Sequence, residues 1–515
     1  MTDLRHSRPA SGSRFVLSAA VLLSFIIMFS NPAAAYRMMI ICPDEYAEFL
    51  RPLERHKDNT GMSTQIVTLE EIEDDYWNFP GGAPFADEPE RIKWAIYDHY
   101  ISYDIEYVML VGDMNVFPVR WIPGELDDWC PQKTADDTLP SPPAAHDYLE
   151  NIWSPSDFYY ADILNDLGLF HSWDRDNNDW FGEVWRGVES SDPDHGKGLN
   201  WDEIDYHPDV AVCRVPADSE EEVRNYVAKV IRYEYNTPHQ AWFENMTFSL
   251  KDDPPWDTEG TTRNMRDNLA PLGFDFHFLA DPCLQYCTDA PDDCTCSAAD
   301  SHTPFYWPLR TGEPTQANIK TLLENGAGFH YHFGHGSPNR WNGSFNTGDV
   351  SSLNNPDKLP VVLCASCSTS RYGPWIPYND HYWSKDRIEV SGAGRGYIRD
   401  TQFPEPYPIQ ANGVSPTGAI YNPAHCMSEE FLVGSESGAI AYYGAYNTGE
   451  GVSQRLMKSF IQSYADNAPG GDVILGDMWI DAIEAYHTEY GVDGHTRSTT
   501  GGAGTMWTFF TPKSF

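Results

Sequence analysis

The chain has 515 residues, 41% of them hydrophobic, which is enough to bury a large core and indicates more than one domain or subdomain. Its formal net charge is −42, from 76 acidic against 34 basic residues. Such a field repels nucleic acid and anionic membrane surfaces, so we expect neither as a partner. It favours calcium, basic peptides or solubility in a salty environment.

Residues 1–35 are typical of a secretory signal peptide. Three arginines precede an apolar run from Phe15 to Phe29, and Ala33-Ala34-Ala35 offers a small-residue cleavage site. That run is short for a membrane span, and no later stretch reaches the ~20 apolar residues that a transmembrane helix needs. We therefore expect a secreted or periplasmic protein that does not insert into a membrane after signal cleavage.

Segment 36–236 predicts a first α/β subdomain, because apolar strands alternate with helices and this order favours a parallel, doubly wound sheet. Its last helix has the clearest signals. Ser219 is the expected N-cap, Glu222 completes a capping box, and Thr237-Pro238 ends the helix. The expected elements are strands at 36–42, 64–69, 107–113 and 209–216, and helices at 45–57, 88–101 and 219–236.

Between about residues 127 and 205 the periodicity is lost, and acidic and aromatic residues dominate. Within this insertion Asp174, Asp176, Asn178 and Glu183 resemble a calcium loop, since calcium takes several hard oxygen ligands from a tightly turned backbone. The pattern departs from an EF-hand, because Asp179 stands where glycine belongs and Glu183 comes early. The alternative is a plain turn rich in Asn and Asp.

Segment 237–515 predicts a second α/β subdomain. Two stretches interrupt it, a Cys-rich loop at 281–300 and an insertion at 371–424. Four cysteines crowd the loop, and in an oxidising compartment one or two local disulfides are favoured over a metal cluster: Cys283, Cys287, Cys294 and Cys296. The expected elements are strands at 246–250, 274–278, 329–333, 359–367 and 438–444, and helices at 262–270, 315–325, 453–463 and 472–486.

Two of these apolar runs end abruptly at a reactive side chain. Phe329–Phe333 is followed by Gly334-His335-Gly336, and the run from Leu359 ends at Cys367. Functional sites in open α/β sheets form at the carboxyl ends of strands, so neighbouring strands would bring His335 and Cys367 together. A thiol beside an imidazole is equipped for nucleophilic catalysis. The backbone N–H groups of Gly336 and Cys367 are candidates for an oxyanion hole.

Two other interpretations use the same part of the chain. A structural role suits His330, His332 and Cys364, because aromatic-flanked histidines and strand cysteines are often simply buried. A zinc site could combine these residues with His335 and Cys367, which supply the right ligand atoms. However, the two cysteines lie within a strand and alternate to opposite faces, so they cannot chelate one ion. Catalysis is therefore the preferred interpretation.

The order of these motifs resembles the gingipain family of cysteine endopeptidases, whose catalytic domain is caspase-like. The resemblance rests on the run Gly334–Ser337 with Trp341, followed by Leu359-Pro360 and then Cys367, and on supporting stretches at 107–113, 156–162, 209–234 and 438–444. It implies a caspase- or gingipain-like α/β fold of mostly parallel sheets flanked by helices, in two subdomains. It also implies protein or peptide substrates.

The resemblance further implies the roles of individual residues. Cys367 becomes the nucleophile and His335 the general acid/base, and cleavage follows Arg or Lys. The acidic specificity residue and a carboxylate that orients the histidine map to the loop 252–259. The specificity candidates are Glu259 and, alternatively, Asp257, and the orienting candidates are Asp252 and Asp253. Because family members bind calcium, the resemblance also favours a structural calcium ion at the loop described above.

Two functions of another class remain open at this point. One is a calcium-dependent extracellular binding or structural protein in which the dyad is vestigial. The other is a zinc-binding protein. The preferred function is a secreted cysteine endopeptidase without an organic cofactor.

Overall fold

The computed structural model describes most of the chain beyond the predicted signal peptide. The described residues are 35–114, 116–123, 153–175, 181–182, 184–186, 198–200, 202–251, 258–281, 304–372, 381–384, 387–390, 398–399, 425–446 and 451–490. Residues 35–515 form one compact unit. Among the described helices, none combines the length and the apolar character needed to cross a membrane.

The first sheet is four-stranded and fully parallel, in the order β2-β1-β3-β8. Its strands are β1 (Met38–Cys42), β2 (Thr64–Thr68), β3 (Tyr107–Val111) and β8 (Ala211–Val215). Every residue of β1, β3 and β8 is buried, as expected for parallel strands covered by helices on both faces. The helices of this half are α1 (Asp44–Asn59), α2 (Leu69–Asp75), α3 (Glu88–Tyr103), α4 (Phe158–Ala161) and α5 (Glu220–Asn236).

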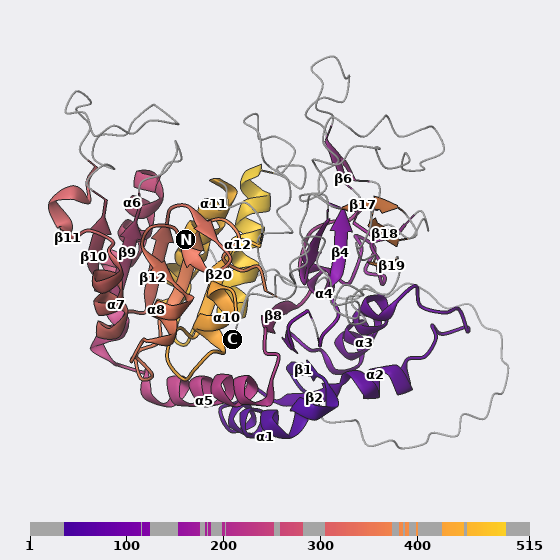
Figure 1. Cartoon of the computed structure of the whole chain (residues 1–515). Helices are drawn as coiled ribbons and strands as arrows, with labels where there is room; N and C mark the ends of the chain where they lie inside the picture. Colours follow the sequence, from indigo (N-terminus) through magenta and orange to yellow (C-terminus); the bar gives the residue numbers. More distant parts are fainter. Residues whose placement is uncertain are drawn as a thin grey trace, which may run out of the picture. The chain divides into compact units, whose positions relative to one another are not determined.

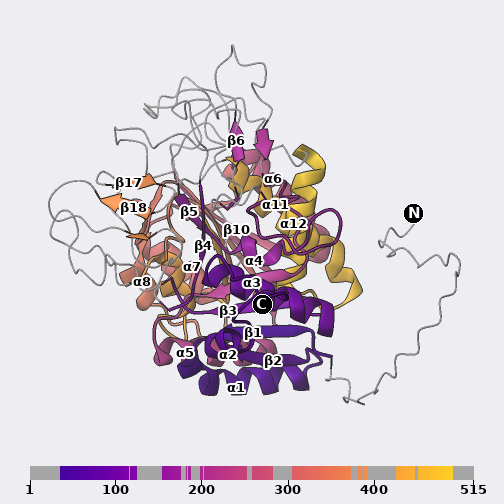
Figure 2. The same ribbon diagram turned by 90° about the vertical axis from the view of Figure 1, so that its right-hand side faces the viewer.

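The helices cover this sheet from two sides. Figures 1 and 2 show α1 and α5 along one side of β1–β3 and α3 on the other. The arrangement follows from chain direction, because β1 to β2 and β2 to β3 run across the sheet in opposite senses. Right-handed crossovers then place their connecting helices on opposite faces.

The second sheet is six-stranded and also fully parallel, in the order β11-β10-β9-β12-β16-β20. Its strands are β9 (Asn245–Leu250), β10 (Asp275–Ala280), β11 (Arg310–Gly312), β12 (Phe329–Phe333), β16 (Val361–Ala365) and β20 (Ala441–Gly444). Its helices are α6 (Thr258–Leu269), α7 (Gln316–Asn325), α8 (Thr347–Ser351), α10 (Met427–Leu432), α11 (Gly451–Asn467) and α12 (Leu475–Tyr490). Mostly parallel sheets flanked by helices confirm the predicted α/β class.

The strand order places a topological switch point between β9 and β12. The chain first runs outward from β9 to β10 and β11, then returns to the other side of β9 and continues through β12, β16 and β20. In open α/β sheets, ligand sites form at the carboxyl ends of the strands beside such a reversal. The end of β12 therefore lies where the fold favours a site.

Small antiparallel sheets accompany the two main ones. One of them, the meander β13-β14-β15, directly follows β12 and was not anticipated from the sequence. Its strands are β13 (Gly336–Ser337), β14 (Arg340–Trp341) and β15 (Phe345–Asn346). The others are β4 (Arg120–Pro123) with β5 (Trp153–Ser156), β6 (Val184–Arg186) with β7 (Gly198–Asn200), and β17 (His381–Ser384), β18 (Arg387–Val390) and β19 (Ile398–Arg399).

The subdomain boundary predicted at 236/237 falls between α5 and β9 and therefore between the two main sheets. Because residues 35–515 form one compact unit, the division into two subdomains stays a prediction. The predicted disulfides of the Cys-rich loop lie outside the described residues, as does most of the insertion at 371–424. None of the five described cysteines, which include Cys364 and Cys367, forms a disulfide with another described cysteine.

A buried ion pair joins the first sheet to the loop that follows β16. Arg214 on β8 donates two hydrogen bonds of 2.6 Å to Asp157, and both side chains have an exposed fraction of 0%. Arg214 also donates to the carbonyl oxygens of Gly112 and Pro118. On its other side, Asp157 accepts a 3.2 Å hydrogen bond from the hydroxyl of Tyr372. The pair thus connects β8 with the segment just beyond Cys367.

Candidate active site

The loops after β12 and β16 start at the same level of the sheet. The two strands are parallel neighbours, and Phe333 lies opposite Ala365 at the end of the ladder. His335 and Cys367 each follow two residues beyond that last pair. The imidazole is exposed and the thiol half-buried, so both can meet a substrate at the surface. The sequence prediction that these strand ends are neighbours is thereby confirmed.

The two loops contact each other through their backbones. A Cβ atom placed on Gly336 would lie 2.6 Å from the carbonyl oxygen of Cys367 and 2.8 Å from Cβ of Ser366, closer than real Cβ atoms come. Only glycine therefore fits at this position. The Ser366 hydroxyl also donates a 2.6 Å hydrogen bond to the carbonyl oxygen of Gly334. These contacts fix the histidine-bearing loop against the cysteine-bearing loop.

The turn that carries Cys367 is sharp. Ser368 has a φ angle of +57°, a left-handed backbone conformation that residues other than glycine rarely adopt. Beyond it, the backbone N–H of Ser370 donates 2.9 Å to the carbonyl oxygen of Ala445, just past β20. Residues held in such sparsely populated conformations cluster at functional sites, where the surrounding structure must enforce them. Here the neighbouring strand and the Gly336 loop provide that support.

Cys364 lies in a different environment from Cys367. It is fully buried in β16, and its sulfur accepts a 3.4 Å hydrogen bond from the Thr369 hydroxyl. Burial raises the pKa of the Cys364 thiol, which disfavours the reactive thiolate. This agrees with the structural role predicted for it. In the described part of the chain, no convergent group of three metal-ligating side chains includes Cys364, Cys367 or the histidines of β12.

His330 and His332 are fully buried and hydrogen-bonded to the neighbouring strand β9. The Thr247 hydroxyl lies 2.8 Å from Nδ1 of His330, and the Ser249 hydroxyl lies 3.0 Å from its Nε2 and 2.8 Å from Nδ1 of His332. The ring of Trp341 stacks on His332 with 4.2 Å between ring centres. Their predicted role as buried support for the strand is therefore confirmed.

We expect these two histidines to make the protein sensitive to acid. Burial lowers the pKa of His330 to about 3 and that of His332 well below its usual value. Below pH ~6.5 the unfolded chain binds protons that these rings do not bind in the fold, so stability falls as the pH falls. The free energy of unfolding should drop by up to about 1.4 kcal/mol per pH unit for each histidine.

Urea denaturation at pH 7, 6 and 5 tests this expectation. The variant His330→Asn should be less stable at pH 7, yet its stability should decline less steeply with acid than that of the wild type. His239→Asn, at an exposed turn, is the control and should keep the wild-type slope. Equal slopes for wild type and His330→Asn would contradict the neutral, buried state of this histidine.

The structure adds a charged pair that the sequence analysis did not identify. The backbone N–H of Lys251 donates 2.8 Å to the carbonyl oxygen of Phe333, and its ammonium group lies 3.0 Å from Asp281. A Cβ on Gly334 would lie 2.7 Å from Cβ of Lys251, so this lysine packs directly against the histidine-bearing loop. Lys251 directly follows β9 and Asp281 directly follows β10. Because sites in open α/β sheets form at the carboxyl ends of strands, inspecting the first few residues after every predicted strand would have identified both.

The predicted specificity and orienting residues are only partly described. Glu259 lies in the first turn of α6, where its carboxylate pairs with Arg263 at 2.6 Å and accepts a 3.2 Å hydrogen bond from the backbone N–H of Phe305. Its side chain is 23% exposed, so it is within reach of solvent. Three other candidates lie outside the described residues: Asp252, Asp253 and Asp257.

Of the predicted calcium ligands, Asp174 alone is described. It is half-buried, and its backbone N–H donates 3.4 Å to the Ser172 hydroxyl. Asp176, Asn178 and Glu183 lie outside the described residues, so the calcium loop stays a prediction.

The family model of peptidase family C25 matches residues 31–387, a range that contains His335 and Cys367. The fold is similar to the crystal structure of the Arg-specific cysteine proteinase gingipain R, with a TM-score of 0.51, 14% identity, and coverage of 90% of this chain and 75% of that chain.

A second solved structure is similar to the same extent. It is the complex of the pro- and mature domains of RgpB from Porphyromonas gingivalis, with a TM-score of 0.50, 14% identity, and coverage of 90% of this chain and 76% of that chain. No curated protein matches the sequence. At 14% identity the two solved structures establish only the fold, whereas the family model establishes which family the sequence belongs to.

Proposed function

Because the chain belongs to peptidase family C25, it is a cysteine endopeptidase, and we propose that Cys367 is its nucleophile and His335 its general acid and base. The observation that carries the assignment is the register of β12 and β16, which starts both loops at one level of the sheet. The exposed imidazole, the half-buried thiol and the close contact of Gly336 with the Cys367 backbone add support.

The chemistry then follows in two steps. The Cys367 thiolate attacks the carbonyl carbon of the scissile bond, and the negative charge on the carbonyl oxygen is stabilised by the backbone N–H groups of Gly336 and Cys367. His335 gives its proton to the leaving amine, and a thioester remains on the sulfur. His335 next removes a proton from water, the resulting hydroxide attacks the thioester, and the acid product leaves as the thiol is restored.

We also propose that cleavage follows basic residues. The solved relative is described as Arg-specific, and a net charge of −42 attracts basic segments of a substrate. Glu259 and Asp257 are the candidate carboxylates for this preference. Since Glu259 already pairs with Arg263, a substrate guanidinium would have to share or displace that partner. In the same proposal residues 1–35 direct the chain out of the cytoplasm.

Peptide libraries with different P1 residues test the specificity. We expect Glu259→Gln or Asp257→Asn to lower kcat/KM for Arg or Lys substrates by about 10–100-fold, because a charge-assisted hydrogen bond is worth roughly 1.5–3 kcal/mol. Asp267→Asn is the matched control, since Asp267 is on the same helix and pairs with the neighbouring Arg266. An unchanged P1 profile in both variants would exclude this loop from substrate recognition.

Covalent labelling tests the nucleophile. A basic acyloxymethyl ketone should modify the full-length protein at one cysteine, and peptide mapping should place the label on Cys367. A label on another cysteine, or on none in a protein that hydrolyses basic substrates, would overturn the assignment.

A further inference from the structure

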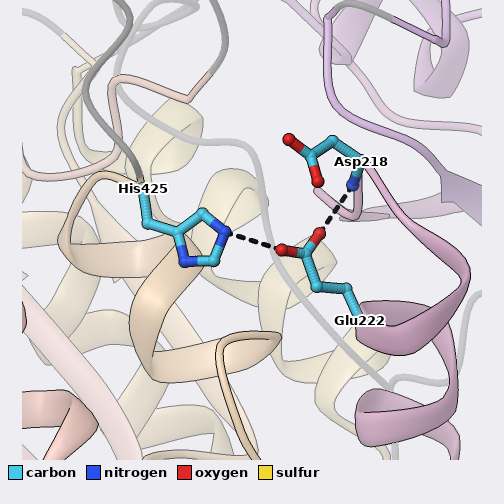
Figure 3. Close-up of side chains that lie close together, drawn as sticks. All are labelled: Asp218, Glu222 and His425. Carbon is cyan, nitrogen blue, oxygen red and sulfur yellow. Dashed lines mark hydrogen bonds and ion pairs between the residues drawn. The ribbon is translucent and has the colours of Figure 1, made fainter.

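A cluster of metal-ligating side chains lies outside the proposed active site. Asp218 directly precedes the N-cap of α5, Glu222 lies in the first turn of that helix, and His425 directly precedes the N-cap of α10. Oxygen atoms of both carboxylates and a ring nitrogen of His425 all lie within 4.8 Å of one another. Figure 3 shows the imidazole facing Glu222, with the carboxylate of Asp218 beside it. Within the described residues, this is the one convergent group of its kind.

The ring of His425 is held in its orientation by Glu430, on the side opposite Glu222. Its Nδ1 lies 2.8 Å from a carboxylate oxygen of Glu430, while its Nε2 points at Glu222 across 2.7 Å. Glu430 is itself held, because its second oxygen accepts a 2.7 Å hydrogen bond from the Ser351 hydroxyl. A carboxylate on one ring nitrogen, with the other nitrogen presented to a ligand, is the usual support of a metal-binding histidine.

Glu222 is also held in place. Its other carboxylate oxygen accepts a 2.7 Å hydrogen bond from the backbone N–H of Asp218, as Figure 3 shows. The sequence predicts that this carboxylate closes a capping box on Ser219. The Ser219 hydroxyl does accept from the N–H of Glu222, at 3.4 Å, but the Glu222 carboxylate is turned to Asp218 and His425 instead. The local capping signal therefore concealed a residue with a long-range partner.

The charges around the cluster favour a divalent cation. Asp218, Glu222 and Glu430 bring three carboxylates to one imidazole. Lys229 is the nearby buried cation, but its ammonium group donates to the carbonyl oxygens of Phe431 and Leu432. Glu222 is buried and already pairs with His425, and buried carboxylates are normally either paired or bound to a metal, so a bound ion would take the place of this pair.

We propose that Asp218, Glu222 and His425 bind a zinc ion, with Glu430 as the outer partner of His425. One imidazole and two carboxylates form a three-ligand set that suits zinc, and the exposed side of Asp218 leaves the fourth position to water. Calcium, which prefers six to eight oxygen ligands, fits this set less well. His425 lies beyond the residues that the family model matches.

The ion would stabilise the active-site loops indirectly, through α10. It would connect α5 with the start of α10, where the N–H of Met427 donates 2.7 Å to the carbonyl oxygen of Pro338 and the N–H of Ser428 donates 3.1 Å to that of Thr369. Pro338 follows the His335 loop, and Thr369 belongs to the Cys367 turn. The site would thus have a structural role, and its detection does not depend on peptidase activity.

The experiment uses the full-length protein with Cys367→Ala, which removes the proposed dyad as a competing metal site. Zinc should raise the melting temperature and bind at a site that Co²⁺ can also fill. The Co²⁺ form should show d–d absorption without thiolate charge-transfer bands, because the ligands are nitrogen and oxygen. Adding His425→Gln should weaken binding by at least about tenfold, as should the outer-partner variant Glu430→Gln, whose effect is expected at about 10–100-fold.

Glu220→Gln is the matched control, since Glu220 is also in the first turn of α5 but pairs with exposed Arg224. It should bind zinc like the parent. Equal zinc affinity in the parent, His425→Gln and Glu430→Gln proteins would overturn the proposal. So would Co²⁺ spectra with thiolate bands alone, which would place the metal on cysteines, or stabilisation by calcium but not by zinc. If His425→Gln fails to fold, the zinc affinity of Glu430→Gln still tests the proposal, because this variant keeps all three proposed zinc ligands.

Discussion

Replacing Cys367 with alanine is expected to lower kcat/KM for peptide hydrolysis by at least about a thousandfold, because the loss of a nucleophile removes the covalent step. The thiol is half-buried at the start of a sharp turn, and its loop lies against Gly336. Since the half-buried Cys367 side chain contributes little to the packing of the core, the variant should fold and have the same melting temperature as the wild type. Activity and thermal unfolding should be measured on the same preparation.

Cys364→Ala is the matched control, because it removes a thiol from the same strand region. Cys364 is fully buried, so its loss should reduce stability slightly while leaving kcat/KM within a few-fold of the wild type. If Cys367→Ala remained active, or if folded Cys364→Ala were inactive, the proposed nucleophile would be wrong.

Replacing Arg214 with methionine should have the largest effect on stability. The substitution leaves the carboxylate of Asp157 buried without its cation, and breaking a buried pair in this way typically costs about 3–5 kcal/mol. The pair has no solvent exposure on either side, so water cannot compensate. Urea denaturation followed by tryptophan fluorescence should therefore show a much lower free energy of unfolding.

Two further variants make this result specific. Removing both charges with Arg214→Met and Asp157→Leu should recover part of the loss, because no uncompensated charge stays buried. Glu220→Gln breaks an exposed pair with Arg224 and should change stability by about 0.5 kcal/mol or less. A loss below about 1 kcal/mol in Arg214→Met would show that the pair is not what stabilises this region.

Much of the fold was predictable because its signals are local. Apolar runs marked the strands, and the Ser219 cap and Thr237-Pro238 break bounded α5 to within a residue. Helix α6 was predicted to begin at Thr262, yet it begins at Thr258. The four extra residues include the buried Thr258 and Thr261, whose tertiary contacts extend the helix beyond its local signal.

The part of the candidate site that lies at the ends of strands was predictable from the sequence. His335 and Cys367 could be paired from the sequence because two parallel strands end at the same edge. Asp281 escaped notice because the strand before it was expected to end at 278, whereas β10 continues to Ala280. Glu222 shows a second kind of failure, because its partner His425 is 203 residues away and no local pattern specifies that contact.

The position of α10 bears on how the polypeptide must be connected. Residues 373–424 separate the Cys367 turn from α10 along the chain, but α10 hydrogen-bonds to both active-site loops. After α10 the chain enters β20, which pairs with β16 over four residue positions. A single peptide-bond cut within 373–424 would therefore yield two fragments held together by the central sheet. We therefore expect a protein nicked in this stretch to keep both fragments together and to remain active, and limited proteolysis followed by an activity assay would test this.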